Sequence, residues 1–101
     1  MNHRSKSGAT PLHDAAIGGS AQAIRTLLDH GAEIDARETE SGDTALYMAA
    51  ALGREECALL LLARGADPKI TAKDGVTPRQ AALANGNGRI AEAISRVAGN
   101  Q

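Results

Sequence analysis

The sequence predicts an all-α protein in which a pair of helices occurs three times and stacks on itself. A stretch that begins at Gly8 returns at Gly42 and again at Gly75, with offsets of 34 and 33 residues. Each copy is followed by a further glycine and then by an aliphatic stretch. A repeat period of roughly 20–50 residues is typical of solenoids, in which each unit buries its apolar faces against its neighbours.

The start and stop signals of the first unit predict an inner helix from Pro11 to Ile17. The hydroxyl of Thr10 is a preferred acceptor for helix amides that have no internal partner, and Pro11 fits the next position because its φ is already helical. Gly18-Gly19 ends the helix. The small pair Ala15-Ala16 leaves a thin face, so a neighbouring helix is expected to pack closely against it.

An outer helix is predicted from Ser20 to His30. Its residues Ile24, Leu27 and Leu28 have the i, i+3, i+4 spacing of one buried stripe. Gly31 follows as the left-handed residue that closes the helix. The first unit is therefore a helix–turn–helix.

The second unit repeats this pattern, with helices predicted from Ala45 to Leu52 and from Arg54 to Arg64. Leu61 is expected to be among the most buried side chains, because the middle unit has a neighbour on both sides. Leu59 aligns with charged residues of the other two units and is expected to face solvent. An isolated exposed leucine is common in folded proteins.

The third unit is more polar. Arg79-Gln80 replaces Leu12-His13, and Ser95 replaces Leu28 in the last helix, which is predicted from about Gly88 to Val97. A terminal repeat has to turn one face to water, and these exchanges are typical of such a cap.

The first unit shows no matching adaptation, although no helix ahead of it covers its open face. Apolar surface is therefore expected around Leu12 and the helix of Ile24. Exposed apolar patches mark contact sites. We expect either weak self-association through this N-terminal face or stabilisation by a helix supplied upstream.

The recurring residues resemble a known family. Thr10-Pro11-Leu12-His13-Asp14-Ala15-Ala16, then Gly19, then an aliphatic helix that ends in Gly-Ala-Asp, as at Gly65-Ala66-Asp67, is similar to the ankyrin repeat. The resemblance covers roughly residues 6–98 and rests on several landmarks in register. It implies a curved solenoid of helix–turn–helix units with projecting hairpins that binds other proteins.

The resemblance also implies a division of the chain into three repeats. Their expected limits are 8–41, 42–74 and 75–98, the last being the C-terminal cap. Residues 1–7 are polar and without period, so a disordered tail is expected there, and 99–101 form a second tail.

Composition excludes several classes of function. The 101 residues carry 11 basic and 12 acidic side chains, a net charge of −1, which offers no electrostatic basis for binding nucleic acid or an anionic membrane. A single cysteine, no signal peptide and no apolar run of membrane-spanning length indicate a cytoplasmic protein. Arginine outnumbers lysine eight to three, which suggests a bacterial source.

No catalytic, cofactor or metal site is predicted. The family resemblance gives His13 a structural part, with hydrogen bonds inside its turn and to the neighbouring repeat, and a catalytic base would need a nucleophile in a pocket. Cys57 is expected to be a small, semi-buried core residue rather than a reactive thiol. The three histidines and one cysteine lack the spacing of metal ligands.

A protein partner is the predicted ligand, because ankyrin-like proteins meet their partners with the hairpin tips and the adjoining concave face of the inner helices. The matching residues of this sequence are Ile17, Arg37, Glu38, Glu40, Asp43, Ala51, Leu52, Lys73, Asp74 and Val76. The apolar members would supply contact area within a charged rim. The simpler reading of the charged members is that exposed turns are polar.

Two functions follow. The chain is either a protein-binding module of unknown partner or the C-terminal structural portion of a longer array, without activity of its own. The capped end and the uncapped beginning favour the second; the initial Met1 favours a complete product.

Overall fold

The computed structural model describes residues 8–99 and the side chains of residues 8–97. This part of the chain forms six helices and no strands, which confirms the all-α repeat fold. The helices are α1 (Pro11–Gly18), α2 (Ala21–Asp29), α3 (Ala45–Leu52), α4 (Glu55–Ala63), α5 (Pro78–Ala84) and α6 (Gly88–Gly99). The tail predicted at 1–7 and residues 100–101 of the tail predicted at 99–101 lie outside the described residues, whereas Gly99, predicted in that tail, belongs to α6.

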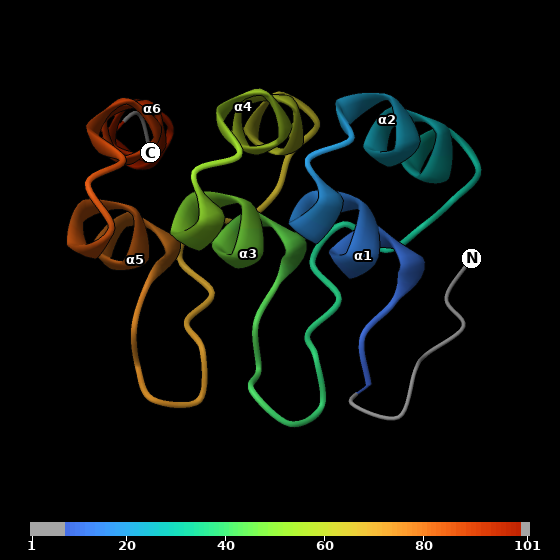
Figure 1. Ribbon diagram of the computed structural model, residues 1–101, viewed down its shortest axis with the longest axis horizontal. Coiled ribbons are helices and arrows are strands. Elements are labelled where there is room, and N and C mark those ends of the chain that lie inside the picture. Colours follow the sequence, from blue (N-terminus) through green and yellow to red (C-terminus); the bar gives the residue numbers. More distant parts are fainter. Residues whose placement is uncertain (1–7, 100–101) are drawn as a thin grey trace.

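The helices form two layers (Figure 1). The inner layer holds α1, α3 and α5, and the outer layer holds α2, α4 and α6. Each helix packs against its partner in the same pair and against its neighbour in the same layer. Two long loops, residues 30–44 and 64–77, project from the inner layer on the side away from the outer helices, and we call them the first and second hairpin.

The same threonine chemistry starts every inner helix. The hydroxyl of Thr44 accepts from the Tyr47 amide at 3.1 Å, and that of Thr77 accepts from the Gln80 amide at 3.1 Å. These bonds satisfy amides that the helix itself leaves open. Thr10 uses a variant described below with His13.

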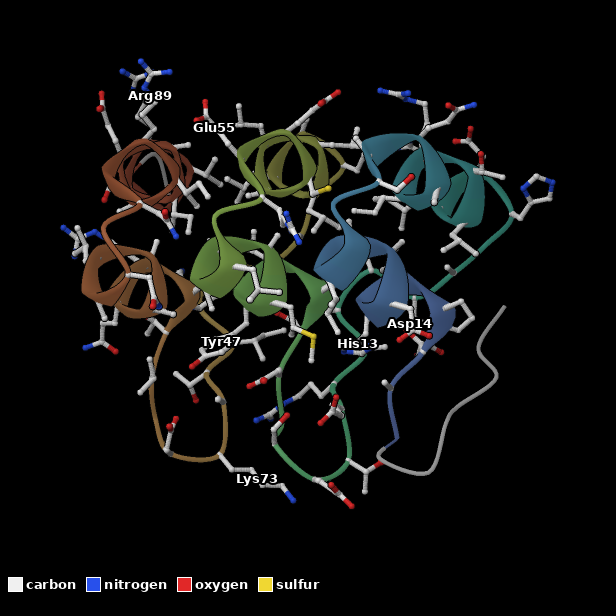
Figure 2. All side chains as sticks on the ribbon, in the orientation of Figure 1. His13, Asp14, Tyr47, Glu55, Lys73 and Arg89 are labelled. Carbon is white, nitrogen blue, oxygen red and sulfur yellow. The ribbon has the colours of Figure 1, made fainter. Side chains whose placement is uncertain are left out.

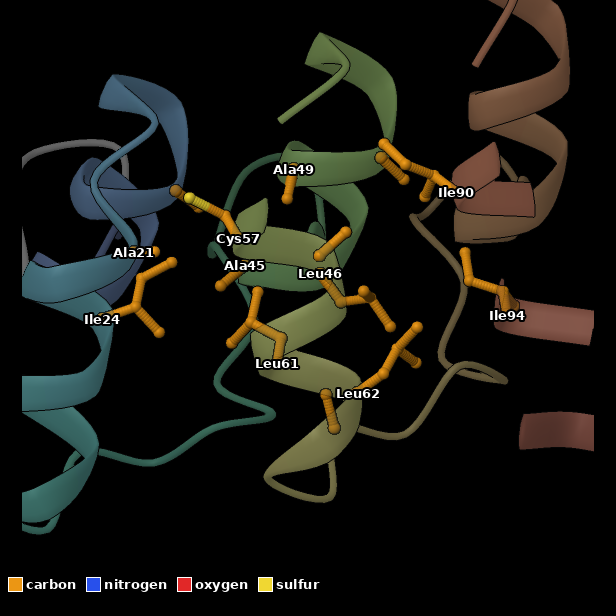
Figure 3. Packing of buried hydrophobic residues seen from close by; sticks show 14 of the residues in the cluster. Ala21, Ile24, Ala45, Leu46, Ala49, Cys57, Leu61, Leu62, Ile90 and Ile94 are labelled. Atoms are coloured by element: carbon orange, nitrogen blue, oxygen red, sulfur yellow. The ribbon is translucent and has the colours of Figure 1, made fainter. Parts of the chain in front are cut away.

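The core between the layers is aliphatic and thin (Figure 3). Its largest fully buried side chains include Leu46, Leu61 and Ile90, and alanines such as Ala49 and Ala58 are completely buried beside them. Small residues at these points let the units stack at short range. A chain with no Trp or Phe can therefore still bury its helices.

The structure confirms the orientation of α4 and corrects one burial prediction, that of Cys57. Leu61 is 0% exposed and Leu59 is 43% exposed, as expected. Cys57 is fully rather than semi-buried, because it lies inside the hydrophobic cluster that runs through all three units. The apolar surface expected around Leu12 and the helix of Ile24 is present in the partly buried Pro11, Ala23 and Leu27, while Leu12 and Ile24 themselves are buried in the core.

At the other end of the stack, α5 and α6 are joined by a polar contact. The Arg79 guanidinium donates to the Ser95 hydroxyl at 2.7 Å. Leu83 is half-exposed, although the equivalent Ala16 and Ala50 are completely buried. This side of the third unit has no following helix pair within the described residues.

Candidate protein-interaction site

We call the inner face the sides of α1, α3 and α5 turned towards the two hairpins, together with the hairpins themselves (Figure 2). The predicted contact residues come from α1, α3 and the two hairpins. Ile17, Ala51 and Leu52 stand in the last turns of α1 and α3. The first hairpin carries Arg37, Glu38, Glu40 and Asp43; the second carries Lys73, Asp74 and Val76.

His13 fastens α1 to the first hairpin. Its Nδ1 accepts from the Thr10 amide at 3.0 Å and lies 2.9 Å from the Thr10 hydroxyl. Because Nδ1 accepts, the proton resides on Nε2, which donates to the Asp43 carbonyl at 2.8 Å. Both ring nitrogens are thus committed within a completely buried side chain. His13 holds the turn and the next repeat together, as the family resemblance implied.

An apolar strip runs along the inner face. Ile17 is 41% exposed and Leu52 is 51% exposed, and Ala51 and Met48 are half-buried beside them. Ile17 and Ala51 follow His13 and Tyr47 by four residues and therefore share a side of their helices with them, and Leu52 follows Met48 by four residues on α3. The strip therefore offers apolar contact area that no described part of the chain covers.

The first hairpin is held in shape by its own side chains. Arg37 donates to the Gly42 carbonyl at 3.0 Å and, across to the second hairpin, to the Thr71 carbonyl at 2.7 Å. Glu38 accepts from the Ser41 hydroxyl at 3.0 Å, while Glu40 is exposed at the tip. Arg37 thus braces the two hairpins, and the carboxylate of Glu40 remains directed to solvent.

The two hairpins also share a backbone bond. The Lys73 amide donates to the Ser41 carbonyl at 2.9 Å, so the tips lie side by side. Asp74 accepts from the Val76 amide at 3.1 Å and is fixed at the turn of the second hairpin. The side chains of Lys73 and Asp74 are exposed, and Val76 is half-buried.

Carboxylates from both hairpins influence one another at the centre of this face. Burial raises the pKa of Asp43, the bond with Ser41 opposes that rise, and the charges of Glu38 and Asp74 add to it. Burial likewise raises the pKa of the Tyr47 phenol, and the carboxylates of Asp43 and Asp74 raise it further. None of the ion pairs among residues 8–97 involves Glu38, Asp43 or Asp74.

Tyr47 and Met48 belong to this surface and were not predicted as contact residues. Tyr47 extends from α3 towards the hairpins (Figure 2), where its counterpart in the first unit is His13. The alignment of the repeats contains the signal that places both, because Tyr47 aligns with His13 and Met48 with Asp14. The residue types at these aligned inner-helix positions differ from one unit to the next, and that difference could have identified Tyr47 and Met48 as candidate contact residues.

Other kinds of site receive no support in the described region. Between residues 8 and 99, no group of three or more histidine, cysteine, aspartate or glutamate side chains is arranged to hold a metal ion. Burial raises the pKa of the Cys57 thiol, and Glu56 adds to the rise against a smaller opposing effect of Arg54. A buried thiol with a raised pKa is a poor nucleophile. None of the helices in this region has the length and apolar character needed to cross a membrane.

Comparison with known proteins adds the family. A family model described as "Ankyrin repeats (3 copies)" matches residues 1–72. The chain is 46% identical over 79 residues to human Ankyrin repeat domain-containing protein 17, an alignment that covers 77% of this chain and 3% of that protein. It is 38% identical over 99 residues to mouse Ankyrin repeat and SOCS box protein 16, covering 90% of this chain and 22% of that protein.

These relatives are much longer proteins, of which the chain spans a small part. One of them, rat Diacylglycerol kinase zeta, is named as an enzyme, is 42% identical over 84 residues and is covered to 9% of its length. Ankyrin repeats are generally non-enzymatic and generally mediate protein–protein interaction. The three helix pairs, the Thr-Pro-Leu-His motif of the first unit and the matches agree: the chain belongs to the ankyrin repeat family.

Proposed function

We propose that this chain binds another protein through its inner face and hairpin tips. The observation that supports it best is the combination of the exposed apolar strip with carboxylates that no ion pair within residues 8–97 neutralises. Apolar contact area bordered by charge is the usual composition of a protein interface. The partner surface that fits carries basic side chains opposite Glu38, Glu40, Asp43 and Asp74.

The affinity should be moderate. Three inner helices and two hairpins offer an area near the roughly 800 Å² per partner of a standard interface. Trp and Phe are absent and Tyr47 is the only aromatic residue, so the side chains that usually dominate binding energy are scarce. Charge complementarity then contributes mainly to encounter rate and specificity.

The test is a charge reversal at the first hairpin, Glu38→Lys with Glu40→Lys. Proteins captured from source cells by the unaltered chain would be identified and their binding to both forms titrated at low and high salt. Binding should weaken by about tenfold or more at low salt, where screening is least, and by less at high salt. Circular dichroism should show intact helices, because both residues lie outside the helices.

Two matched single substitutions distinguish an effect of where the charge is changed from an effect of the change in net charge. Glu40→Lys and Glu56→Lys change the net charge equally and alter an exposed side chain each, the first at a hairpin tip and the second on the outer helix α4. Only Glu40→Lys should weaken binding. Equal effects of the two at low salt would indicate a general charge effect and would place the partner elsewhere.

The alternative function, that the chain is the C-terminal structural portion of a longer array, is supported by the relatives, which are much longer proteins of which this chain spans a small part.

A further inference from the structure

Two asparagine–glycine pairs follow one another between the last two helices. Asn85-Gly86 and Asn87-Gly88 join the end of α5 to the start of α6. Asparagine is a thermolabile residue, and it loses ammonia fastest before glycine, whose nitrogen has no neighbouring side chain to hinder its attack on the asparagine Cγ. The structure gives the two pairs different surroundings, so their reactivity should differ.

The first pair is held in an unreactive conformation. Asn85 ends α5 with φ −103 and ψ 12, and with this ψ the Gly86 nitrogen is turned away from the Asn85 side chain. The Gly86 amide donates to the Leu83 carbonyl at 3.2 Å, and Asn85 Nδ2 donates to the Ala81 carbonyl at 2.8 Å. Attack on the Asn85 Cγ therefore requires that both bonds break and that the last turn of α5 unwinds.

The side chain of the second pair is held by a single hydrogen bond. Asn87 Nδ2 donates to the Ala50 carbonyl of α3, in the preceding unit, at 2.8 Å. The Gly88 amide has no acceptor among residues 8–97. It begins the 12-residue helix α6, whose positive end favours loss of the amide proton and hence attack by this nitrogen.

Water has access to this second pair. Asn87 is only partly buried, and a pocket of about 260 Å³ lies beside it, with Gly53 and Gly88 also in its lining. A pocket of this volume and polar lining has room for several water molecules. Water is the only co-reactant that conversion of an asparagine to an aspartate needs.

We propose that Asn87-Gly88 is a site of spontaneous deamidation, which reacts ahead of Asn85-Gly86 in the folded chain and loosens the third unit from the second. The Gly88 nitrogen forms a bond to the Asn87 Cγ, the Cγ–Nδ2 bond breaks, and the amide proton leaves with Nδ2 as ammonia. Water then opens the resulting succinimide at either carbonyl and leaves aspartate or isoaspartate at position 87. The proposal is independent of the binding role of the inner face.

The product cannot restore the contact between the units. A carboxylate only accepts hydrogen bonds, so it cannot donate to the Ala50 carbonyl as Asn87 Nδ2 does. In the second unit the aligned residue is Arg54, which donates to the Ile17 carbonyl at 3.1 Å and has no amide to lose. In the first unit the aligned residue is Ser20. Of these three aligned positions, only that of the third unit can therefore change in this way.

Peptide mapping by mass spectrometry tests the order of reaction. The 101-residue chain would be incubated in mildly alkaline buffer and the deamidated asparagine located by fragmentation at successive times. In the folded chain Asn87 should convert about tenfold faster than Asn85 or more, since opening of one side-chain contact is enough to release it. In concentrated urea the two rates should be similar. Equal rates in the folded chain, faster conversion of Asn85, or a difference that persists in urea would overturn the proposal.

Gly88→Ala is the control for the nucleophile. A Cβ at this helical position would meet nothing within 4 Å, so the fold should be kept. The added methyl group hinders the nitrogen, and conversion of Asn87 should slow by about tenfold or more while that of Asn85 is unchanged. Conversion of Asn87 at the unaltered rate would show that the Gly88 nitrogen is not the nucleophile and would contradict the proposal.

Asn87→Asp reproduces one product and tests its consequence. Loss of the bond to the Ala50 carbonyl should speed hydrogen exchange of the amides in the middle of α6 by about tenfold, because the third unit opens more often. Amides of α1 and α2 should exchange as in the unaltered chain. Unchanged exchange in α6 would show that this bond does not fasten the third unit and would overturn that part of the proposal.

Discussion

Leu59 and Leu61 are separated by one residue in α4 and meet opposite surroundings. Leu61→Ala should lower the free energy of unfolding by about 2–5 kcal/mol, the range for truncating a buried leucine, whereas Leu59→Ala should change it by about 0.5 kcal/mol or less. The reason is that Leu61 is 0% exposed and Leu59 is 43% exposed. Urea titration followed by circular dichroism measures both. Equal losses would show that the packing of α4 is different.

Asp43 should make the stability of the fold depend on pH. Its folded-state pKa is raised above the ordinary value of 3.8, mainly by burial, so the protonated form favours the folded state. The stability contributed by this group is present below pH 3.8 and is lost as the pH rises through the raised pKa. Asp43→Asn should therefore be slightly more stable than the unaltered chain at pH 7, and the difference should vanish near pH 3.

Thermal unfolding at several pH values measures this effect, with Glu40→Gln as the baseline for losing an exposed carboxylate of the same hairpin. A gain in stability that does not depend on pH would contradict the role assigned to ionisation. If the inner face binds a basic partner, the same Asp43→Asn substitution should weaken binding while it stabilises the fold.

At the scale of elements, the two hairpins approach each other closely at Gly42. Gly42 has φ +76, and a Cβ placed on it would lie 2.9 Å from Arg37 Nη2 and 3.0 Å from the Lys73 amide nitrogen. Gly75 has φ +84 at the same place in the next hairpin, yet a Cβ there would meet nothing within 4 Å. Gly42→Ala should therefore cost more stability than Gly75→Ala.

In both variants the alanine has to adopt a left-handed backbone conformation, which costs about 1–2 kcal/mol. The difference between the two losses of stability therefore measures the packing of one hairpin on the other. Denaturant midpoints of the two variants give this difference directly. Equal midpoints would mean that the hairpins move apart to accommodate the added methyl group at position 42 without loss of stability. The Lys73–Ser41 bond would then contribute little to the contact between the two hairpins.

The helices could be predicted from the sequence because their signals are local. Threonine caps, Pro11, closing glycines and the aliphatic stripe placed the predicted helix limits within two residues of those observed. The hairpins could not be derived in the same way, because their shape depends on contacts with the next repeat. The bond from Arg37 to the Thr71 carbonyl joins side chain and backbone 34 residues apart, and no spacing rule specifies it.

At the scale of the whole molecule, the stack is asymmetric. The repeats predicted open apolar surface at the first unit, and the partly buried Pro11, Ala23 and Leu27 lie there, while Leu12 and Ile24 themselves are buried. The partner-binding residues remain a proposal, because alignment of a chain with itself identifies variable positions and not the surface that a partner has shaped.

The scarcity of aromatic residues has an optical consequence. Tyr47 is the only aromatic side chain, with no Trp or Phe in the chain, and it lies on the inner face where Asp43 and Asp74 act on its phenol. The ultraviolet emission of the protein therefore arises from one fluorophore at the middle of the proposed contact surface. A tryptophan-free ligand that seats there would alter the lifetime and quenching of that emission, so the chain carries an unlabelled reporter of its own occupancy.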